Sequence, residues 1–325
     1  MTCNLTRITD FILMGISGSL NLKLAIFLML SIAYILTIVG NVLIVLLVSG
    51  SKKLHSPMYF FLCHLSSLDI LLSTNVVPYL LSTLLGTAKT MSLNACFTQY
   101  YFNSSSTVSE CLLLMAMSYD RYVAICIPLN YIMIMNTKIC LHLVVWSWVV
   151  GFGLNLTSVM SMYGTDFCGC NIIDHIYCDH AALLDLSCTD TSIMELETSV
   201  FSIPIVLLPF MFVMVTYIKI VSAILKITST SGRRKAFSTC TSHIIVVAAY
   251  FGTLVAKYTT PPSGSSLNAN KVISFLYIVF TPLLNPAVYT LRNKDILECI
   301  HKWFPVKYIG LNNNFRQCRT QKTIT

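Results

Sequence analysis

Long apolar runs separated by short polar segments make up most of the chain. Between Leu24 and Ser49 there is no charged residue, and a bilayer span requires about 20 mainly apolar residues. Further runs of this kind follow, so the pattern predicts seven membrane-spanning helices at about residues 24–49, 57–82, 96–119, 140–162, 196–222, 238–258 and 272–291. The expected fold is an all-α membrane protein, a seven-transmembrane helix bundle over residues 24–291. Tails precede it over residues 1–23 and follow it over residues 292–325.

The composition agrees with a membrane protein. Of the 325 residues, 55% are hydrophobic and only 10% are charged, whereas about 25% are charged in a soluble domain. These proportions exclude a disordered chain, a nucleic-acid-binding module and an ordinary cytosolic enzyme.

The positive charges predict the orientation of the bundle. If the N-terminus lies outside, the outer segments hold only five of the 21 Lys and Arg residues, namely Arg7, Lys23, Lys89, Lys257 and Lys271. Cytoplasmic segments carry an excess of Lys and Arg. We therefore expect a multi-pass plasma-membrane protein with an extracellular N-terminus and a cytoplasmic C-terminus.

Three segments match the glycosylation pattern Asn-X-Ser/Thr. Asn4-Leu5-Thr6 lies on the predicted outer tail, so we expect Asn4 to carry a glycan. Asn103-Ser104-Ser105 and Asn155-Leu156-Thr157 fall within predicted spans, beyond the reach of the glycosylation machinery. We interpret these two as chance matches.

Cysteines gather in the predicted outer loop between spans four and five. Cys168, Cys170, Cys178 and Cys188 lie there, and Cys96 stands at the outer end of span three. The oxidising exterior permits disulfides. Five cysteines leave one over, and Cys3 is also outside, so the pairing stays open. Zinc binding with His175 and His180 is the alternative, although the spacing matches no common zinc motif.

Two acidic residues lie inside predicted spans, where a carboxylate costs on the order of 2.5–3.5 kcal/mol. Asp69 is near the middle of span two, and Glu110 is just past the middle of span three. One interpretation is a shared cation site or a polar switch. The other is a pair of protonated acids bonded to neighbours such as Ser66, Ser73 or Ser106.

Span three also carries a polar stripe. Asn103, Thr107 and Glu110 recur at helical spacing, with Ser104 and Cys111 beside them. A polar stripe avoids lipid and therefore faces the bundle. The outer half of the bundle could hold a mostly apolar pocket with a few hydrogen-bonding groups, which suits a small organic ligand. Hydrogen bonding between helices without a ligand is the alternative.

Four motifs occur in order along the chain. They are Pro57–Leu62 (PMYFFL), Met115–Cys126 (MAMSYDRYVAIC), Lys235–His243 (KAFSTCTSH) and Pro282–Tyr289 (PLLNPAVY). Together they closely resemble the motifs of olfactory receptors, a branch of the rhodopsin-like (class A) G-protein-coupled receptors. The resemblance covers about residues 10–300.

The resemblance implies a receptor for a small volatile odorant that activates a stimulatory, olfactory-type heterotrimeric G protein and raises cyclic AMP. It implies disulfides from Cys96 to Cys178 and from Cys168 to Cys188, which leaves Cys170 unassigned. It favours a cation such as sodium at Asp69 and Glu110. The activation switch that it implies consists of Asp120, Arg121, Tyr217, Asn285, Pro286 and Tyr289.

Ligand-binding residues are also implied by position, each with ordinary core packing as the alternative. They are Asn103, Ser104, Thr107, Val108 and Cys111 on helix three, Phe201, Ser202 and Ile205 on helix five, Phe251, Leu254, Val255 and Tyr258 on helix six, and Ile278 on helix seven.

Two departures from the family pattern occur on helix six. The usual Phe-Tyr-Gly is Tyr250-Phe251-Gly252 here, which moves the hydroxyl by about 100° around the helix. Lys257 is unusual near the outer end. We interpret it as snorkelling to water, with recruitment of an acidic or carbonyl-bearing ligand as the alternative.

Two other classes of function were weighed. A transporter or channel would show internal repeats or a charged pathway, and neither is visible. A membrane enzyme would need a clustered catalytic set, which the seven histidines do not form. We therefore expect no enzymatic activity and no cofactor.

Overall fold

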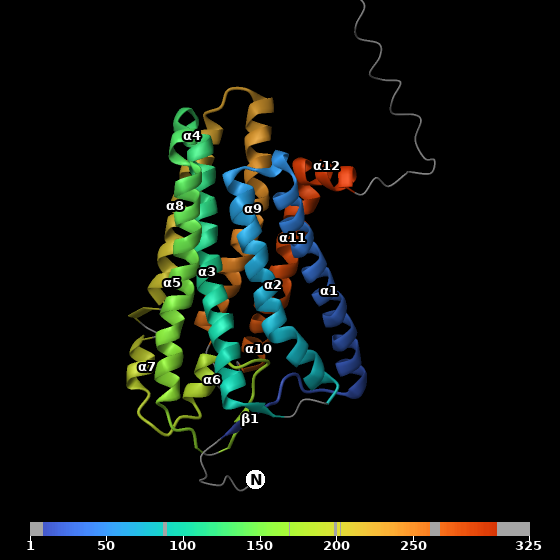
Figure 1. Cartoon of the computed structure of the whole chain (residues 1–325), viewed down its shortest axis with the longest axis vertical. Helices are drawn as coiled ribbons and strands as arrows, with labels where there is room; N and C mark the ends of the chain where they lie inside the picture. Colours follow the sequence, from blue (N-terminus) through green and yellow to red (C-terminus); the bar gives the residue numbers. More distant parts are fainter. Residues whose placement is uncertain are drawn as a thin grey trace, which may run out of the picture.

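The protein is described by a computed structural model that places residues 9–86, 90–168, 170–197, 200–201, 203–260 and 267–303. Long helices run side by side along the molecule (Figure 1). They are α1 (Leu20–Gly50), α2 (Pro57–Leu84), α3 (Leu93–Cys126), α5 (Thr137–Tyr163), α8 (Ile203–Leu225), α9 (Thr230–Thr259) and a composite of α10 (Leu267–Phe275), η5 (Leu276–Phe280) and α11 (Thr281–Arg292).

The lengths and apolarity of these helices suit a membrane. Among the described residues, six helices are long and apolar enough to cross one, and α3 together with the bent segment Pro128–Ile134 makes a seventh. The composite helix includes one π-helical segment, η5. The expected fold class, an all-α bundle of seven transmembrane helices, is confirmed.

A small sheet marks one end of the bundle. Strand β1 (Asp10–Leu13) lies between β2 (Met91–Ser92), to which it is antiparallel, and β3 (Ile172–Ile173), to which it is parallel. The short helices α6 (His180–Leu184) and α7 (Ser192–Glu197) lie near it (Figure 1). We call this end the sheet end.

The opposite end carries η1 (Lys52–Leu54), η2 (Pro128–Asn130), α4 (Tyr131–Ile134) and α12 (Lys294–Trp303). Helix α12 crosses the bundle direction (Figure 1), and we call this the α12 end. Ile296 and Cys299 are buried, while Lys53 pairs with Asp295 and Glu298 at 3.1 and 2.5 Å. Prediction from long apolar runs missed α12 because only one face of this helix is apolar.

Polar side chains determine where several helices begin. Ser92 Oγ accepts a hydrogen bond from Ala95 N at the start of α3, and Asn136 Oδ1 accepts one from Ile139 N at the start of α5. Such caps satisfy backbone N–H groups that have no partner within the helix. Helix α2 begins instead at Pro57, a residue whose fixed φ suits the first turn.

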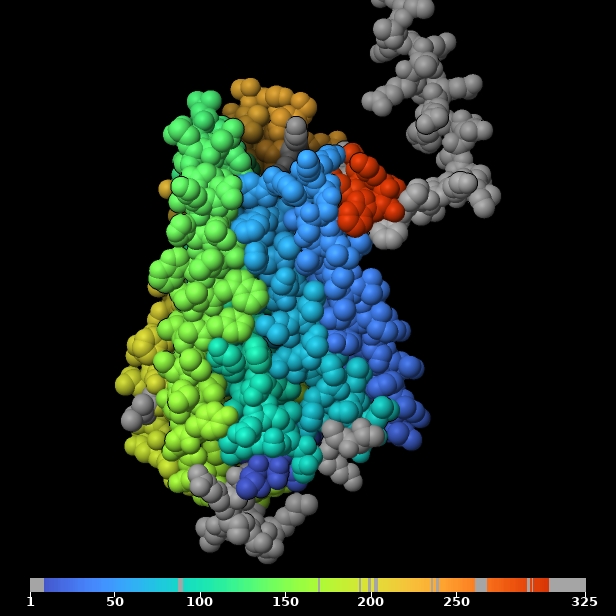
Figure 2. Space-filling model, viewed as in Figure 1, coloured from blue at the N-terminus to red at the C-terminus, as the bar shows by residue number. Residues whose placement is uncertain are grey.

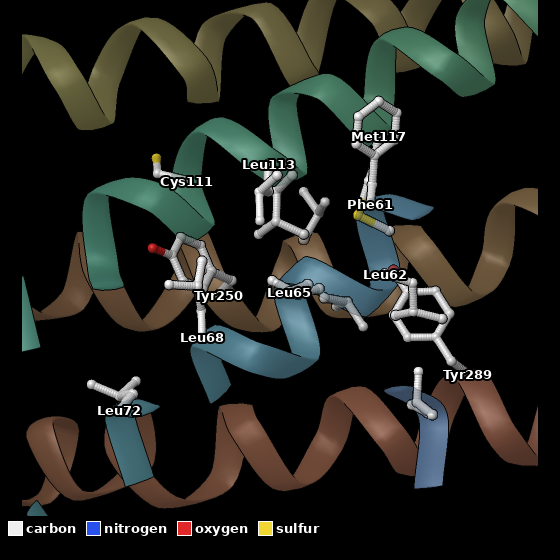
Figure 3. Close-up of a cluster of buried hydrophobic side chains, with 14 of the residues drawn as sticks. Phe61, Leu62, Leu65, Leu68, Leu72, Cys111, Leu113, Met117, Tyr250 and Tyr289 are labelled. Carbon is white, nitrogen blue, oxygen red and sulfur yellow. The ribbon is translucent and has the colours of Figure 1, made fainter. Parts of the chain in front are cut away.

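The core runs along the middle of the bundle, and the outer surface is apolar as well. Phe61, Leu65, Leu113 and Tyr250 are fully buried where α2, α3 and α9 meet (Figure 3). Figure 2 shows the face formed by α1, α2, α3 and α5. Apolar side chains of these helices are exposed, and Trp146 of α5 is 64% exposed. An apolar exterior around an apolar core is the arrangement that lipid requires.

Close packing of α3 against α5 depends on Gly151. A Cβ atom added to Gly151 would lie 2.8 Å from Ser105 O and 3.0 Å from Ser109 N, and it would overlap Ser109 Oγ. Small residues at such crossings let membrane helices approach closely.

Replacement of Gly151 by valine is expected to reduce the amount of folded receptor at the cell surface. The two backbones must separate to accept the side chain, at a cost of about 1–3 kcal/mol. Gly153→Val is the matched control, because a Cβ atom there meets nothing within 4 Å. Flow cytometry of a surface tag would measure both variants, and equal surface levels would contradict the packing argument.

Candidate functional site

A cavity of about 250 Å³ opens within the bundle toward the sheet end. Its wall combines apolar side chains of α3, α8 and α9 with hydroxyl, amide and charged groups. The lining residues are Tyr100, Asn103, Ser104, Thr107, Val108, Asn155, Asp179, His180, Ala181, Ile205, Val206, Leu254, Lys257, Tyr258, Thr260, Asn270 and Tyr277. A small cavity whose wall combines apolar side chains with many hydrogen-bonding groups suits a small organic molecule that carries polar atoms.

Most of the helix-three residues predicted for a ligand site line this cavity. Asn103, Ser104, Thr107 and Val108 do so, because positions three and four apart share one face of a helix. Ile205, Leu254 and Tyr258 join them from α8 and α9.

Other predicted ligand residues lie elsewhere. Phe201 is 51% exposed and Val255 is 46% exposed, so both point out of the bundle. Phe251 and Val255 line a separate apolar groove between α8 and α9. Cys111 and Ile278 are buried in the core and are not part of the cavity wall. Ser202 lies outside the described residues.

Hydrogen bonds tie three helices together at the inner limit of the cavity. Thr107 Oγ1 lies 2.7 Å from Tyr277 Oη, and the Tyr250 hydroxyl donates to the carbonyl oxygen of Thr107. Phe251, the next residue along α9, faces the apolar groove instead. The Tyr250-Phe251 order therefore directs the hydroxyl to α3 and leaves an apolar ring beside α8.

Lys257 does not extend to water as the snorkelling interpretation expected. Its Nζ lies 2.8 Å from Asp179 Oδ1, and it also donates to the Tyr177 hydroxyl. The side chain is 20% exposed and lines the cavity. The expectation of snorkelling considered only α9 and lipid, whereas the loop that precedes α6 supplies a counter-ion.

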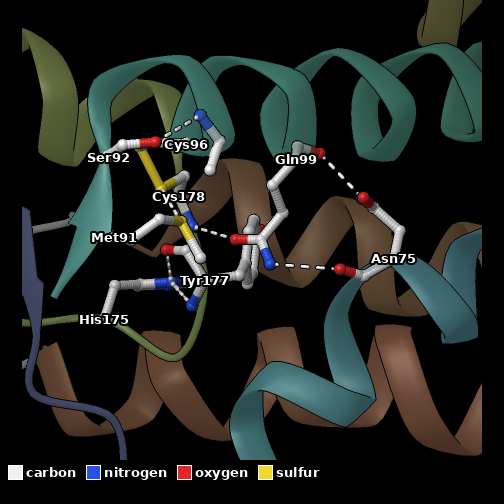
Figure 4. The surroundings of a disulfide bond; sticks show 9 residues. Asn75, Met91, Ser92, Cys96, Gln99, His175, Tyr177 and Cys178 are labelled. Carbon is white, nitrogen blue, oxygen red and sulfur yellow. Dashed lines mark hydrogen bonds between the residues drawn. A yellow bond between two sulfur atoms is a disulfide. The ribbon is translucent and has the colours of Figure 1, made fainter. Parts of the chain in front are cut away.

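Two disulfides hold that loop. Cys96 at the start of α3 is joined to Cys178, and Cys168 is joined to Cys188. Beside the Cys96–Cys178 disulfide, Gln99 Oε1 accepts a hydrogen bond from Cys178 N at 3.0 Å. Gln99 is also hydrogen-bonded to Asn75 (Figure 4). Cys170 is also disulfide-bonded. Because Cys168, Cys178 and Cys188 are cross-linked, their sulfurs are not thiolate ligands for zinc, as that alternative required.

The buried acids lie deeper in the bundle. Asp69 accepts two hydrogen bonds from Asn285 Nδ2, at 2.9 and 3.1 Å, and Glu110 is buried as well. No hydrogen-bond partner within the described part of the chain is found for Glu110 Oε1 or for the Ser66 and Ser106 hydroxyls. Unpartnered buried oxygens of this kind fit a cation or water.

The predicted switch residues lie toward the α12 end. Arg121 forms an ion pair with Asp120, which is fully buried and also accepts from the Tyr131 hydroxyl at 2.7 Å. Tyr217 bonds to His243 Nδ1. Pro286 packs so closely on Gly40 that an added Cβ would lie 2.9 Å from its ring. Tyr289 is buried at the same end.

Several residues of these sites were missed. Asn155 lines the cavity, although its sequon was interpreted only as a chance match. A buried amide in an apolar span was a signal in its own right. Tyr277, Asn270 and His180 also line the cavity, and no spacing in the sequence separates them from core or loop residues. Asn4, the predicted glycan carrier, lies outside the described residues.

Comparison with known proteins supplies the family context. A family model described as olfactory receptor matches residues 30–307. The chain is 42% identical to Olfactory receptor 6B1 of Homo sapiens over 299 residues, which cover 92% of this chain and 96% of that protein. It is 43% identical to Olfactory receptor 11L1 of Homo sapiens over 299 residues, covering 92% and 93%. It is 41% identical to Olfactory receptor 5G9 of Mus musculus over 310 residues, covering 95% and 99%.

Proposed function

Because the chain belongs to the olfactory receptor family, we propose that it binds a small volatile organic odorant in the cavity at its sheet end and activates a stimulatory, olfactory-type G protein at its α12 end. Activation would raise cyclic AMP. Membership of this family makes the chain a multi-pass plasma-membrane receptor and not an enzyme. The observation that supports the ligand site is the cavity itself, whose wall combines apolar side chains with hydrogen-bonding groups.

The proposed orientation places residues 1–23 outside the cell and residues 292–325 in the cytosol. Two features support it. The disulfides Cys96–Cys178 and Cys168–Cys188 lie at the sheet end, and disulfides persist in oxidising compartments. Lys and Arg gather at the opposite end, as in cytoplasmic segments. Asn4 would then be accessible to glycosylation.

The proposed signal is a shift between two packings of the bundle. A ligand favours the packing that it binds more tightly, and it shifts the equilibrium by no more than this difference in affinity. Thr107 lies in the cavity wall and bonds to Tyr277. A ligand there would alter a contact between α3 and the composite seventh helix.

The proposed G-protein site is the α12 end. Arg121 is held there by Asp120, and separation of this ion pair would free the guanidinium. Tyr217 and the basic segment Arg233–Lys235 belong to neighbouring helices at the same end. Asn285 and Pro286 connect the seventh helix with α2 and α1, and the buried Tyr289 lies one turn further along. Asp69 and Glu110 would hold a sodium ion between the two ends.

A panel of odorants applied to cells that express the receptor tests this proposal. We expect a subset of compounds to raise cyclic AMP in a dose-dependent manner, in cells that also express the olfactory stimulatory G protein. Cells without the receptor are the control. Absence of any response, with the receptor shown to be at the surface, would contradict the proposed function.

Truncation of Leu254 to alanine tests the location of the ligand. Leu254 is buried and lines the cavity, whereas its neighbour Val255 is 46% exposed and faces the outer groove. Leu254→Ala is expected to raise the half-maximal odorant concentration about tenfold, a loss of about 1.4 kcal/mol of binding. Val255→Ala is the matched control and should respond as the unmodified receptor does. Equal shifts in both variants would argue against this cavity.

A further inference from the structure

The mouth of the cavity holds an ion pair made by residues of two different elements. Lys257 comes from the last turns of α9, and Asp179 precedes α6 in the disulfide-linked loop. Their charged atoms lie 2.8 Å apart, with side chains only 20% and 12% exposed. The Tyr177 hydroxyl donates to the same Asp179 oxygen at 2.9 Å.

The short contact between the ammonium and the carboxylate is that of an ion pair. Burial alone would raise the pKa of Asp179, but the charge of Lys257 and the hydrogen bonds from Lys257 and Tyr177 hold the pKa below its usual value. Burial lowers the pKa of His180 and of His175, which disfavours the charged imidazolium in both. Lys257 and Asp179 compensate each other's charge at the mouth.

The ammonium group of Lys257 retains a donor for a ligand. An ammonium has three N–H groups. Tyr177 and Asp179 accept two of them, and no third acceptor is found within the described part of the chain. Because Lys257 lines the cavity, the remaining N–H can reach an oxygen atom of a molecule bound there.

Charge compensation limits which ligands gain from this donor. A carboxylate would be attracted by Lys257 but repelled by Asp179, and it would lose its hydration on entry. An ammonium group would be repelled by Lys257. A neutral ketone or alcohol oxygen accepts a charge-assisted hydrogen bond and adds no charge. The apolar part of the wall, which includes Val108, Val206 and Leu254, suits a hydrocarbon skeleton.

We infer that Lys257 is a specificity-determining residue that donates to the oxygen of a neutral oxygenated ligand, and that Asp179 makes the cavity reject carboxylates by compensating the lysine charge. The inference rests on the proposed function, because it concerns the ligand of the same cavity. It predicts that removal of the Asp179 charge changes which ligands activate the receptor.

Ligands that share one carbon skeleton would test the inference. Each of several skeletons is presented as the alkane, the ketone, the primary alcohol, the carboxylic acid and the amine, and cyclic AMP is measured together with surface level. In the unmodified receptor, the ketone or alcohol should act at a concentration at least tenfold lower than the acid, the amine or the alkane. Asp179→Asn should improve the acid relative to the ketone at least tenfold.

Three further variants separate recognition from folding. Lys257→Met should reduce the response to the ketone to that of the alkane. The double variant Lys257→Met with Asp179→Asn removes both charges, so no charge is left buried without a partner, and it should show the same loss. Lys271→Met is the matched control, because Lys271 pairs with Asp174 at 2.5 Å at the same end but does not line the cavity. It should leave the order of ligands unchanged.

Two results would overturn the inference while the proposed function stands. One is a wild-type response to acids at concentrations as low as those for ketones. The other is an order of ligands that stays the same in Asp179→Asn and in the double variant. If a surface-delivered wild-type receptor responds to no compound of any class, the proposed function fails and the inference fails with it.

Discussion

Replacement of Arg121 by alanine is expected to abolish the rise in cyclic AMP that an odorant evokes, without preventing delivery of the receptor to the cell surface. The guanidinium is 13% exposed and is bound to the fully buried Asp120. In the proposed mechanism, activation separates this pair and presents the positive charge to the G protein. Alanine can pair neither with Asp120 nor with the G protein, so the active packing lacks the positive charge that the G protein would contact.

The measurement is cyclic AMP at a saturating odorant concentration, normalised to surface level. Removal of Arg121 leaves Asp120 with the Tyr131 hydroxyl as its hydrogen-bond partner among the described residues, and an unpaired buried charge destabilises a fold. The double variant Asp120→Asn with Arg121→Ala removes both charges and therefore separates a loss of signalling from a loss of folding. Normal signalling by either variant would contradict the role of Arg121.

The sequence predicted the number of long helices and one wall of the cavity. A run of about 20 apolar residues is long enough to indicate a span on its own. Polar residues at helical spacing on α3 avoid lipid and therefore face other helices. Asn103, Thr107 and Val108 could therefore be assigned to the cavity without coordinates.

Residues at the margins of a helix face could not be assigned in this way. Phe251, Leu254, Val255 and Tyr258 cover a face of α9 that is wider than the cavity. Whether a marginal residue meets the cavity or the outer groove depends on how α8 and α9 are separated, which no single helix encodes. The same limit explains why Val255 lines the outer groove, whereas Leu254 lines the cavity.

Contacts between a loop and a helix were the other limit. The prediction for Lys257 considered only lipid and water as its surroundings. Its partner Asp179 lies 78 residues earlier in the chain. The disulfide from Cys96 to Cys178 joins that loop to the start of α3, next to the mouth of the cavity. Asn155 was not predicted for the cavity, although an amide within a span is costly and requires a partner.

Loss of the Cys96–Cys178 disulfide is expected to remove most of the receptor from the cell surface. Its sulfurs close a sequence separation of 82 residues, and the chain-entropy model gives about 4–5 kcal/mol for a loop of that size. Native stabilities are about 5–15 kcal/mol, so this loss is a large fraction of the total. It would also free the segment that carries Tyr177 and Asp179 from the start of α3.

The Cys168–Cys188 disulfide closes only 20 residues, for which the same model gives about 3 kcal/mol. We therefore expect Cys96→Ser with Cys178→Ser to reduce the surface level more than Cys168→Ser with Cys188→Ser. Cys63→Ser is the control, because Cys63 is a free cysteine that is only half-buried. Flow cytometry of surface receptor checks the order. A larger loss of surface receptor in the Cys168→Ser, Cys188→Ser variant would show that loop entropy does not dominate. The contacts of Cys168 and Cys188 near β3 would then be the main stabilisers of the sheet end.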